Sequence, residues 1–400
     1  MLVCSQLGRA SDLSGGVITG GARGIYDPEV PEELRVRDGL PNVFKKLQDG
    51  ETVHIGYVGG SITEANGWRP KSFAWFKEQY PNADLVEINA AIPGTGADFA
   101  ASRIATDLLP YNPDLVMIEY RVNGARGFDA RAVEGLVRQI WEHNTETDIC
   151  FFYTIAEWML KDMQAGKQYH FGKTMEQIAN HYGIPSVDLG VEVVKQMNSG
   201  DLIFKDDGPV EGKLVFSQDG VHPGDAGHGL YNEIARRSLD TIRAQKSESR
   251  KDLPAPLNTN HFGSAKLMPI SEAEQSKGWT KVDIEADDIY RRDTRRTHNM
   301  LRGGLKSDRV GETLTIHWVG RTIGLTHIPQ GDGMEIEVSI DGNASEVVKF
   351  KQSSDKYLYA QFHYLPEQPQ GEHTATIRIR NLPNGSAFYF GQVIVVSDPE

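Results

Sequence analysis

The first half of the chain alternates short apolar runs with amphipathic stretches of helical period. The apolar runs have the length of buried strands and lie at 54–58, 85–89, 114–120, 148–154 and 184–189. The helical stretches lie at 41–48, 69–80, about 96–109, 129–143, 170–182, 191–198 and 226–243. Strands that alternate with helices of this length indicate a parallel, doubly wound α/β sheet with right-handed crossovers.

The second half of the chain changes to period two. Strand-like runs lie at 314–319, 334–340, 347–350, 357–362, 374–380 and 388–396, with no helical pattern between them. Asp341-Gly342 is a hairpin signal. Short strands at regular spacing predict an antiparallel β-sandwich or jelly roll.

These patterns divide the chain into segments. Residues 1–38 are Gly-rich and irregular and are interpreted as a covering segment, followed by an α/β domain at 39–245. Residues 246–262 are charged, contain proline and predict a linker, and the β-sandwich domain is expected at 263–400. Within the α/β domain, turn signals at 206–209 between short apolar runs predict a hairpin over 200–217.

The candidate chemistry lies at the ends of the predicted strands. Ser61 follows Gly59-Gly60 at a strand-to-helix turn, where little side-chain bulk shields a hydroxyl and free N–H groups begin a helix. A serine there is most often a helix N-cap, so the position alone decides nothing. In a parallel sheet, however, ligands bind outside the carboxyl ends of the strands, where Ser61 is a candidate nucleophile.

Three other positions supply what a serine nucleophile needs. His222 is a candidate general base, and Asp219, three residues earlier, is placed to fix the imidazole tautomer. The N–H groups of Ser61 and Gly94 and the side-chain amide of Asn123 are candidate donors to a tetrahedral oxyanion. Taken singly, Asn123 reads as an Asx turn and Asp219 as a loop cap.

The order of these blocks resembles the SGNH, or GDSL-like, hydrolase superfamily. The matching blocks are Gly59-Gly60-Ser61-Ile62-Thr63, Asn89 through Gly94, Asn123, and Asp219-Gly220-Val221-His222-Pro223. The resemblance covers about residues 50–243 and implies a flavodoxin-like fold with catalytic Ser61, Asp219 and His222. It also implies a metal-free esterase without a cofactor, and the appended β-sandwich favours a carbohydrate O-acetylesterase. The family usually has Asp after the third-block Asn, whereas this chain has Gly124.

Further polar and aromatic residues near strand ends are candidates for the substrate pocket. They are Trp68, Arg69, Glu119, Arg121, Glu157 and Trp158. Structural alternatives stay open: Trp68-Arg69 as the start of a helix core, and Glu119 with Arg121 as an ion pair. The basic cluster Arg291, Arg292, Arg295 and Arg296 is either a solvated turn or a contact with the catalytic domain or an acidic glycan.

Composition and net charge limit the classes of partner that the protein is expected to bind. The chain has 400 residues and a formal net charge of −13, which disfavours nucleic acid and anionic membranes as partners. Its two cysteines, Cys4 and Cys150, lack zinc spacing, and no apolar run spans a membrane. The sequence leaves the oligomeric state and the compartment open, including secretion or a periplasmic location after removal of a signal.

The prediction is therefore a serine hydrolase that cleaves an acyl ester, most readily an O-acetyl group on a carbohydrate. Two alternatives stay open. One is a non-catalytic carbohydrate-binding protein, and the other is a glycan-active enzyme on the same fold that uses carboxylates such as Glu119 or Glu157 in place of the serine.

Overall fold

The computed structural model describes residues 25–245, 247–249, 252–283, 287, 294–351 and 360–399. Its first part contains a six-stranded sheet with the order β1-β6-β5-β4-β2-β3. These strands are β1 (Leu34–Arg35), β2 (Thr52–Gly59), β3 (Asp84–Asn89), β4 (Leu115–Glu119), β5 (Asp148–Tyr153) and β6 (Ser186–Asp188). All pairs are parallel except β1 with β6. The order β3-β2-β4-β5-β6 is the flavodoxin-like one, so the predicted fold class is confirmed.

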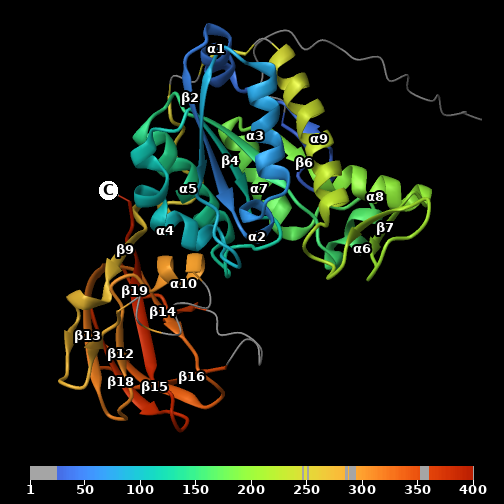
Figure 1. The fold of residues 1–400 in the computed structure, drawn as a ribbon. Coiled ribbons are helices and arrows are strands. Elements are labelled where there is room, and N and C mark those ends of the chain that lie inside the picture. The colour runs from blue at the N-terminus through green and yellow to red at the C-terminus, as the bar shows by residue number, and fades with distance from the viewer. Residues whose placement is uncertain are drawn as a thin grey trace, which may run out of the picture.

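Helices cover both faces of this sheet (Figure 1). One face packs on α1 (Pro41–Asp49), α3 (Trp68–Gln79), α8 (Leu189–Ser199) and α9 (Asp225–Ala244). The other packs on α4 (Ala97–Asp107), α5 (Asp129–His143) and α7 (His170–Tyr182). Successive β4 residues pack alternately into the apolar cores on the two faces of the sheet. Leu115 and Met117 pack on one face, and Val116 and Ile118 pack on the other. The strands are therefore apolar throughout, as sequence analysis expects of a sheet buried on both faces.

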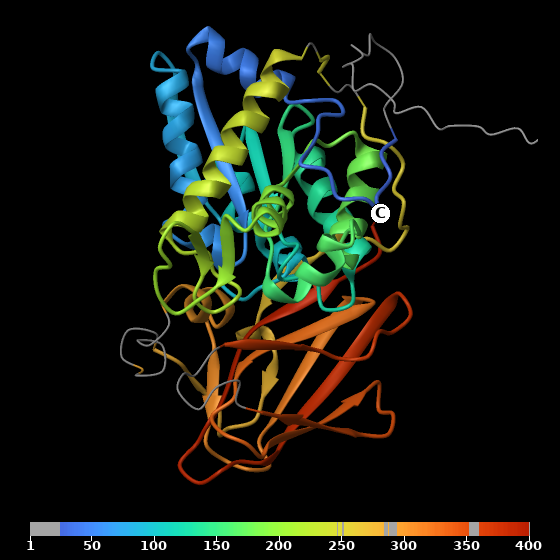
Figure 2. The ribbon, with the colours of Figure 1, turned by 90° about the vertical axis from the view of Figure 1, so that its right-hand side faces the viewer.

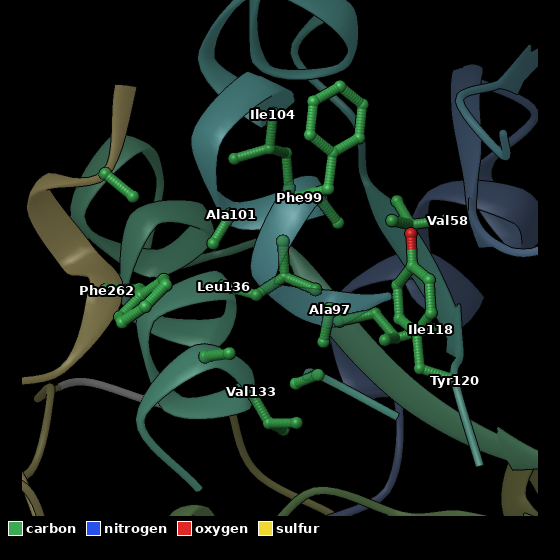
Figure 3. Packing of buried hydrophobic residues seen from close by; sticks show 14 of the residues in the cluster. Val58, Ala97, Phe99, Ala101, Ile104, Ile118, Tyr120, Val133, Leu136 and Phe262 are labelled. Carbon is green, nitrogen blue, oxygen red and sulfur yellow. The ribbon is translucent and has the colours of Figure 1, made fainter. Parts of the chain in front are cut away.

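The core under α4 and α5 extends beyond the sheet. Figure 3 shows Phe99 on α4 and Leu136 on α5 in one cluster with Ile118 of the sheet and Phe262, the last residue of the predicted linker. The described residues also form short helices near the strand ends: α2 (Ser61–Glu64), η1 (Leu109–Tyr111), η2 (Glu157–Met159) and α6 (Leu160–Gln164). Helix α2 is one that the pattern of apolar residues does not reveal, because it is a single turn.

The predicted hairpin over 200–217 is wrong. Strands β7 (Leu202–Lys205) and β8 (Leu214–Ser217) pair in parallel, with Leu202 opposite Leu214. The chain between them returns to the start of β7, where the N–H of Leu214 donates to the carbonyl oxygen of Asp201 at 3.0 Å. The turn signals mark this connection correctly, but turn residues alone do not set the direction of the following strand.

The second part consists of two facing antiparallel sheets, with the orders β10-β13-β18-β15-β16 and β11-β12-β19-β14-β17. The first contains β10 (Glu274–Gln275), β13 (Thr313–Gly320), β18 (Gly371–Asn381), β15 (Met334–Ile340) and β16 (Glu346–Phe350). The second contains β11 (Thr280–Lys281), β12 (Leu305–Ser307), β19 (Phe388–Val396), β14 (Thr322–Ile328) and β17 (Gln361–Tyr364), with β9 (Lys266–Pro269) on β19. Both sheets contribute to one apolar core, which confirms the predicted β-sandwich.

Some elements of the sandwich escape the period-two pattern. Strand β14 is buried at every position, so it lacks the alternation that reveals a half-buried strand. Helix α10 (Thr294–Met300) lies where no helix is expected, and the described strand near 357–362 is β17 at 361–364. Tyr357, Tyr359, Arg291 and Arg292 lie outside the described residues. The turn at Asp341-Gly342 joins β15 to β16, as predicted, with both residues at positive φ.

The sandwich lies beneath the carboxyl edge of the parallel sheet, with α10 facing that edge (Figures 1 and 2). Described residues of the predicted linker form no helix or strand until Phe262, which begins the short helix η3 (Phe262–Ser264), and they contact α5. The Glu134 carboxylate on α5 accepts the N–H groups of Leu257 and Asn258 at 2.6 and 2.8 Å. Across the interface, Phe99 stacks on Phe362 with 5.4 Å between ring centroids. The two parts therefore share a buried apolar contact.

Candidate active site

Ser61 lies at the carboxyl edge of the sheet, where β2 ends at Gly59 and α2 begins. The two preceding glycines permit close packing under this turn. A Cβ on Gly59 would lie 2.9 Å from the Glu119 carbonyl oxygen, and one on Gly60 would overlap the side chain of Asn123. As the first residue of a helix, Ser61 has an N–H without an intrahelical acceptor.

His222 and Asp219 reach Ser61 from the loop between β8 and α9. The Ser61 Oγ lies 2.8 Å from His222 Nε2, and His222 Nδ1 lies 2.7 Å from Asp219 Oδ2. Since a carboxylate only accepts, Nδ1 carries the proton and Nε2 is left to accept from the Ser61 hydroxyl. The structure thus brings the three predicted residues into one hydrogen-bonded chain.

The Asp219 carboxylate is held in its ionised form. Partial burial acts to raise its pKa, but hydrogen bonds from the His222 side chain and from the N–H groups of His222 and Val221 lower that pKa well below its usual range. The side chains of Asp219 and His222 are 55% and 49% exposed, so the pair is open to solvent. An ionised Asp219 favours a protonated imidazole during proton transfer.

Ser217 organises this loop, and sequence analysis does not single it out. Its hydroxyl is buried, donates to the His222 carbonyl oxygen at 2.8 Å and accepts the N–H of Gly220 at 3.0 Å. A serine two residues before Asp219, at the start of a turn, is the signal that could have identified it.

The candidate oxyanion donors lie on neighbouring loops. Gly94 has φ +65°, a conformation that favours glycine, and the N–H of Ala97 joins the two loops by donating to the Gly124 carbonyl oxygen at 2.9 Å. Asn123 packs against Gly60, next to Ser61. Gly124 itself has φ +69° with open space beside it, which gives a reason for glycine at the position where the family usually has Asp.

Four of the predicted pocket residues are instead buried structural residues. Trp68 is fully buried and stacks on Phe152, and Arg69 donates to the Thr63 carbonyl oxygen and pairs with Glu87. Because their side chains belong to the core around α2 and α3, the prediction that they line the pocket is wrong.

Glu119 and Arg121 are also fully buried, and they do not pair as the structural alternative proposed. Glu119 accepts the hydroxyl groups of Thr63 and Thr154 at 2.9 and 2.6 Å. Burial raises its pKa, although the hydrogen bonds from these threonines act to lower it. Arg121 binds Asp188 at 2.6 Å. Neither side chain reaches the surface at which a substrate binds.

Glu157 and Trp158 are exposed and lie beside the His222 loop. The N–H of Glu157 donates to the Gly220 carbonyl oxygen at 2.8 Å, and the Trp158 side chain is 51% exposed. An open groove of about 640 Å³ adjoins the loop, and its lining includes Pro209, Lys213, Leu214, Asp219, His222 and Pro223. This is the size of a ligand-binding cleft.

His228 has a structural role. Its Nδ1 accepts the Trp68 N–H at 3.2 Å, and burial lowers its pKa to about 4. Within the described ranges, no cluster of three or more His, Cys, Asp or Glu side chains is suited to a metal ion. No helix in the same ranges is both long and apolar enough to cross a membrane.

Two solved structures share the fold of nearly the whole chain. A crystal structure of a two-domain esterase active on acetylated mannans, co-crystallised with mannopentaose, is 22% identical, covers 93% of this chain and 98% of its own, and has a TM-score of 0.76. A second structure of a two-domain esterase active on acetylated mannans is 23% identical, with the same coverage and a TM-score of 0.74. At this identity the likeness shows the fold. No curated protein matches the sequence.

Part of the α/β domain matches a family model. Residues 57–230, which contain Ser61, Gly94, Asn123, Asp219 and His222, match the model of the GDSL-like lipase/acylhydrolase family. This region is similar to that family, and the predicted enzyme class, a carboxylic ester hydrolase, is confirmed.

Proposed function

We propose that this protein removes acyl groups, foremost O-acetyl groups, from a carbohydrate through an acyl-Ser61 intermediate. The observation that carries the proposal is the chain of hydrogen bonds from Ser61 through His222 to Asp219, at 2.8 and 2.7 Å. It lies at the carboxyl edge of a parallel sheet, beside the candidate oxyanion donors Gly94 and Asn123.

Acylation begins when His222 Nε2 takes the hydroxyl proton of Ser61 while Oγ attacks the ester carbonyl carbon. The resulting oxyanion accepts hydrogen bonds from the N–H groups of Ser61 and Gly94 and from the Asn123 amide. When the tetrahedral intermediate collapses, the ester C–O bond breaks, and His222 returns the proton to the sugar oxygen that leaves.

Deacylation repeats these steps with water. His222 Nε2 takes a proton from a water molecule, whose oxygen attacks the acyl-Ser61 carbonyl carbon. Collapse then breaks the bond to Ser61 Oγ, which regains a proton from His222, and the free carboxylic acid leaves. Asp219 stays ionised and stabilises the imidazolium in both halves.

Three observations support a carbohydrate ester as the substrate. The two-domain esterases that share the fold over 93% of this chain act on acetylated mannans. The groove beside His222 is open and has a volume of about 640 Å³, and Trp158 offers an exposed aromatic face at the same loop. The net charge of −13 fits a neutral glycan better than an anionic one.

The carboxylate alternative is less well supported. Glu119 is enclosed between Thr63 and Thr154, so it cannot contact a substrate, whereas Glu157 is exposed and lies 3.5 Å from Lys205. A glycosidase needs two carboxylates that flank the scissile bond. Of the two carboxylates proposed for this alternative, Glu119 and Glu157, only Glu157 is exposed to solvent.

The test compares wild type with Ser61→Ala on p-nitrophenyl acetate, with a fluorophosphonate probe and intact mass in parallel. We expect one probe adduct on Ser61 and loss of turnover in the variant. Glu157→Gln is the control and should keep both. Turnover that survives in Ser61→Ala, or is lost in Glu157→Gln, contradicts the acyl-Ser61 mechanism.

The substrate class is tested by acetate release from acetylated mannan, acetylated xylan and their chemically deacetylated forms. Wild type should release acetate from an acetylated glycan, and Ser61→Ala should not. A protein that binds glycan equally well with and without Ser61 and releases no acetate is the non-catalytic binding protein.

A further inference from the structure

Two residues of the β-sandwich domain hold the loop that carries Gly94 in the α/β domain. We infer that Tyr364 and Arg296 are positioning residues for the Gly94 N–H, so that the oxyanion site is completed across the domain interface. The inference rests on the proposed function, because it assumes that the Gly94 N–H stabilises the oxyanion.

Tyr364 acts at the end of the loop where α4 begins. Its hydroxyl donates to Asp98 Oδ2 at 2.8 Å, and the Asp98 side chain is fully buried. Asp98 Oδ1 faces back to the loop, since a Cβ on Gly96 would lie 2.5 Å from it and 2.5 Å from the Gly124 carbonyl oxygen. The Asp98 carboxylate therefore packs between Tyr364 and the backbone of Gly96.

Arg296 acts at the other end of the loop. This residue of α10 directs Nη1 to the Pro93 carbonyl oxygen at 3.5 Å. The same nitrogen occupies the space that a side chain on Gly94 would need. A guanidinium group thus lies directly against the Cα of the candidate oxyanion glycine.

Aromatic contacts across the domain interface place Tyr364. Tyr364 packs edge-on against Phe128 of the α/β domain with 4.7 Å between ring centroids. Beside it, Phe362 stacks on Phe99 and lies under the Arg126 guanidinium, 3.9 Å from the ring centroid to Cζ. Because these rings are shared by both domains, docking of the sandwich fixes where the Tyr364 hydroxyl points.

Positioning of the Gly94 loop by Tyr364 and Arg296 stabilises the transition state and does not affect substrate binding. An oxyanion donor contributes only when it lies within hydrogen-bond distance of the developing charge. A loop shifted by a fraction of an ångström weakens that bond, while the ground-state contacts that determine KM are unaffected. The signature is a loss in kcat together with weaker binding of a tetrahedral mimic.

The experiment measures kcat and KM for p-nitrophenyl acetate and the inhibition constant of phenylboronic acid in the full chain. Tyr364→Phe and Arg296→Gln should each lower kcat by about tenfold or more and weaken boronate inhibition by a similar factor. KM should stay within about twofold, because ground-state contacts are retained. Arg296→Gln leaves the Tyr364–Asp98 bond in place, so it tests the inference even where Tyr364→Phe fails to fold.

The matched control is Tyr389→Phe. Tyr389 also donates to an aspartate, Asp287 at 3.0 Å, but both partners belong to the sandwich domain. Its kcat and boronate inhibition should equal those of wild type. Wild-type values in Tyr364→Phe and Arg296→Gln overturn the inference, as does an equal loss in Tyr389→Phe. Full turnover in Ser61→Ala overturns instead the proposed function.

Discussion

Glu119 accepts a 2.9 Å hydrogen bond from the hydroxyl of Thr63, two residues after the candidate nucleophile Ser61. A second bond, from Thr154 at 2.6 Å, ties the same carboxylate to the end of β5. Glu119 is therefore a buried acid that stabilises the turn carrying Ser61 and does not contact the substrate.

Glu119→Gln should destabilise the fold. The amide keeps only one acceptor oxygen, so one of the two threonine hydroxyls that donate to Glu119 faces an NH2 group instead, and an unsatisfied buried group costs about 1–3 kcal/mol. Urea unfolding measures this loss, and Glu157→Gln at the surface is the control. Loss of esterase turnover in Glu119→Gln with unchanged stability would instead indicate a chemical role for Glu119.

Asp219→Asn should reduce kcat by about 10²–10⁴-fold with little change in KM, because an amide no longer selects the imidazole tautomer that accepts from Ser61. The fold should persist, since the side chain is 55% exposed. Steady-state kinetics on p-nitrophenyl acetate measure the effect. A variant with wild-type kcat would remove Asp219 from the mechanism.

Asp98 should make stability depend on pH. Burial raises its pKa to about 6, while the hydrogen bond from Tyr364 and the charge of Arg126 act in the opposite direction. The fold thus favours the protonated carboxyl. Its stabilisation is complete below the usual pKa of an aspartate and is lost as the pH rises to about 6, a decrease of about 3 kcal/mol in unfolding free energy.

The measurement is urea unfolding of wild type and Asp98→Asn between about pH 4 and pH 7. The amide is neutral throughout, so this part of the slope should disappear in the variant. Asp308→Asn, whose side chain is 79% exposed, serves as the control. Equal slopes in Asp98→Asn and wild type would contradict the assignment.

Gly124→Ala should lower the unfolding free energy by about 1–2 kcal/mol, because φ +69° is unfavourable for a residue with a Cβ. Gly124→Asn should cost less than Ala, since Asn tolerates this conformation, and the open space excludes a clash for either residue. Thermal or urea unfolding separates the two. Equal losses would mean that backbone strain is not the reason for glycine here.

Trp158→Ala should raise KM for an acetylated glycan several-fold and leave p-nitrophenyl acetate hydrolysis unchanged. The exposed ring lies beside the His222 loop, where it can stack on a sugar that the small ester lacks. Tyr111→Ala is the matched control: its ring is 54% exposed but lies just before β4, at the opposite edge of the sheet. A raised KM for both substrates, or for neither, would contradict a sugar-stacking role.

The local pattern of apolar residues and the position of polar residues at strand ends predict much of the fold and of the candidate site. The runs at 54–58 and 114–120 predict buried strands because both faces of the sheet are covered, and carboxyl ends of parallel strands converge. Ser61 and Asn123 follow from this rule, whereas the Asp219/His222 loop follows β8 of the separate two-stranded sheet and is predicted from the spacing of its Asp and His. Each depends on contacts that are short in sequence or on the geometry common to all such sheets.

Only the tertiary structure shows which residues a side chain contacts and whether that side chain is buried. Glu119 and Arg121 follow β4 as pocket candidates do, yet both turn inward, to Thr63 and Asp188. The direction of β8, the burial of β14 on both faces and the contacts of Arg296 and Tyr364 with the Gly94 loop arise from segments far apart in the chain. Local periodicity cannot encode them, because burial and hydrogen-bond partners are set by packing across the interface.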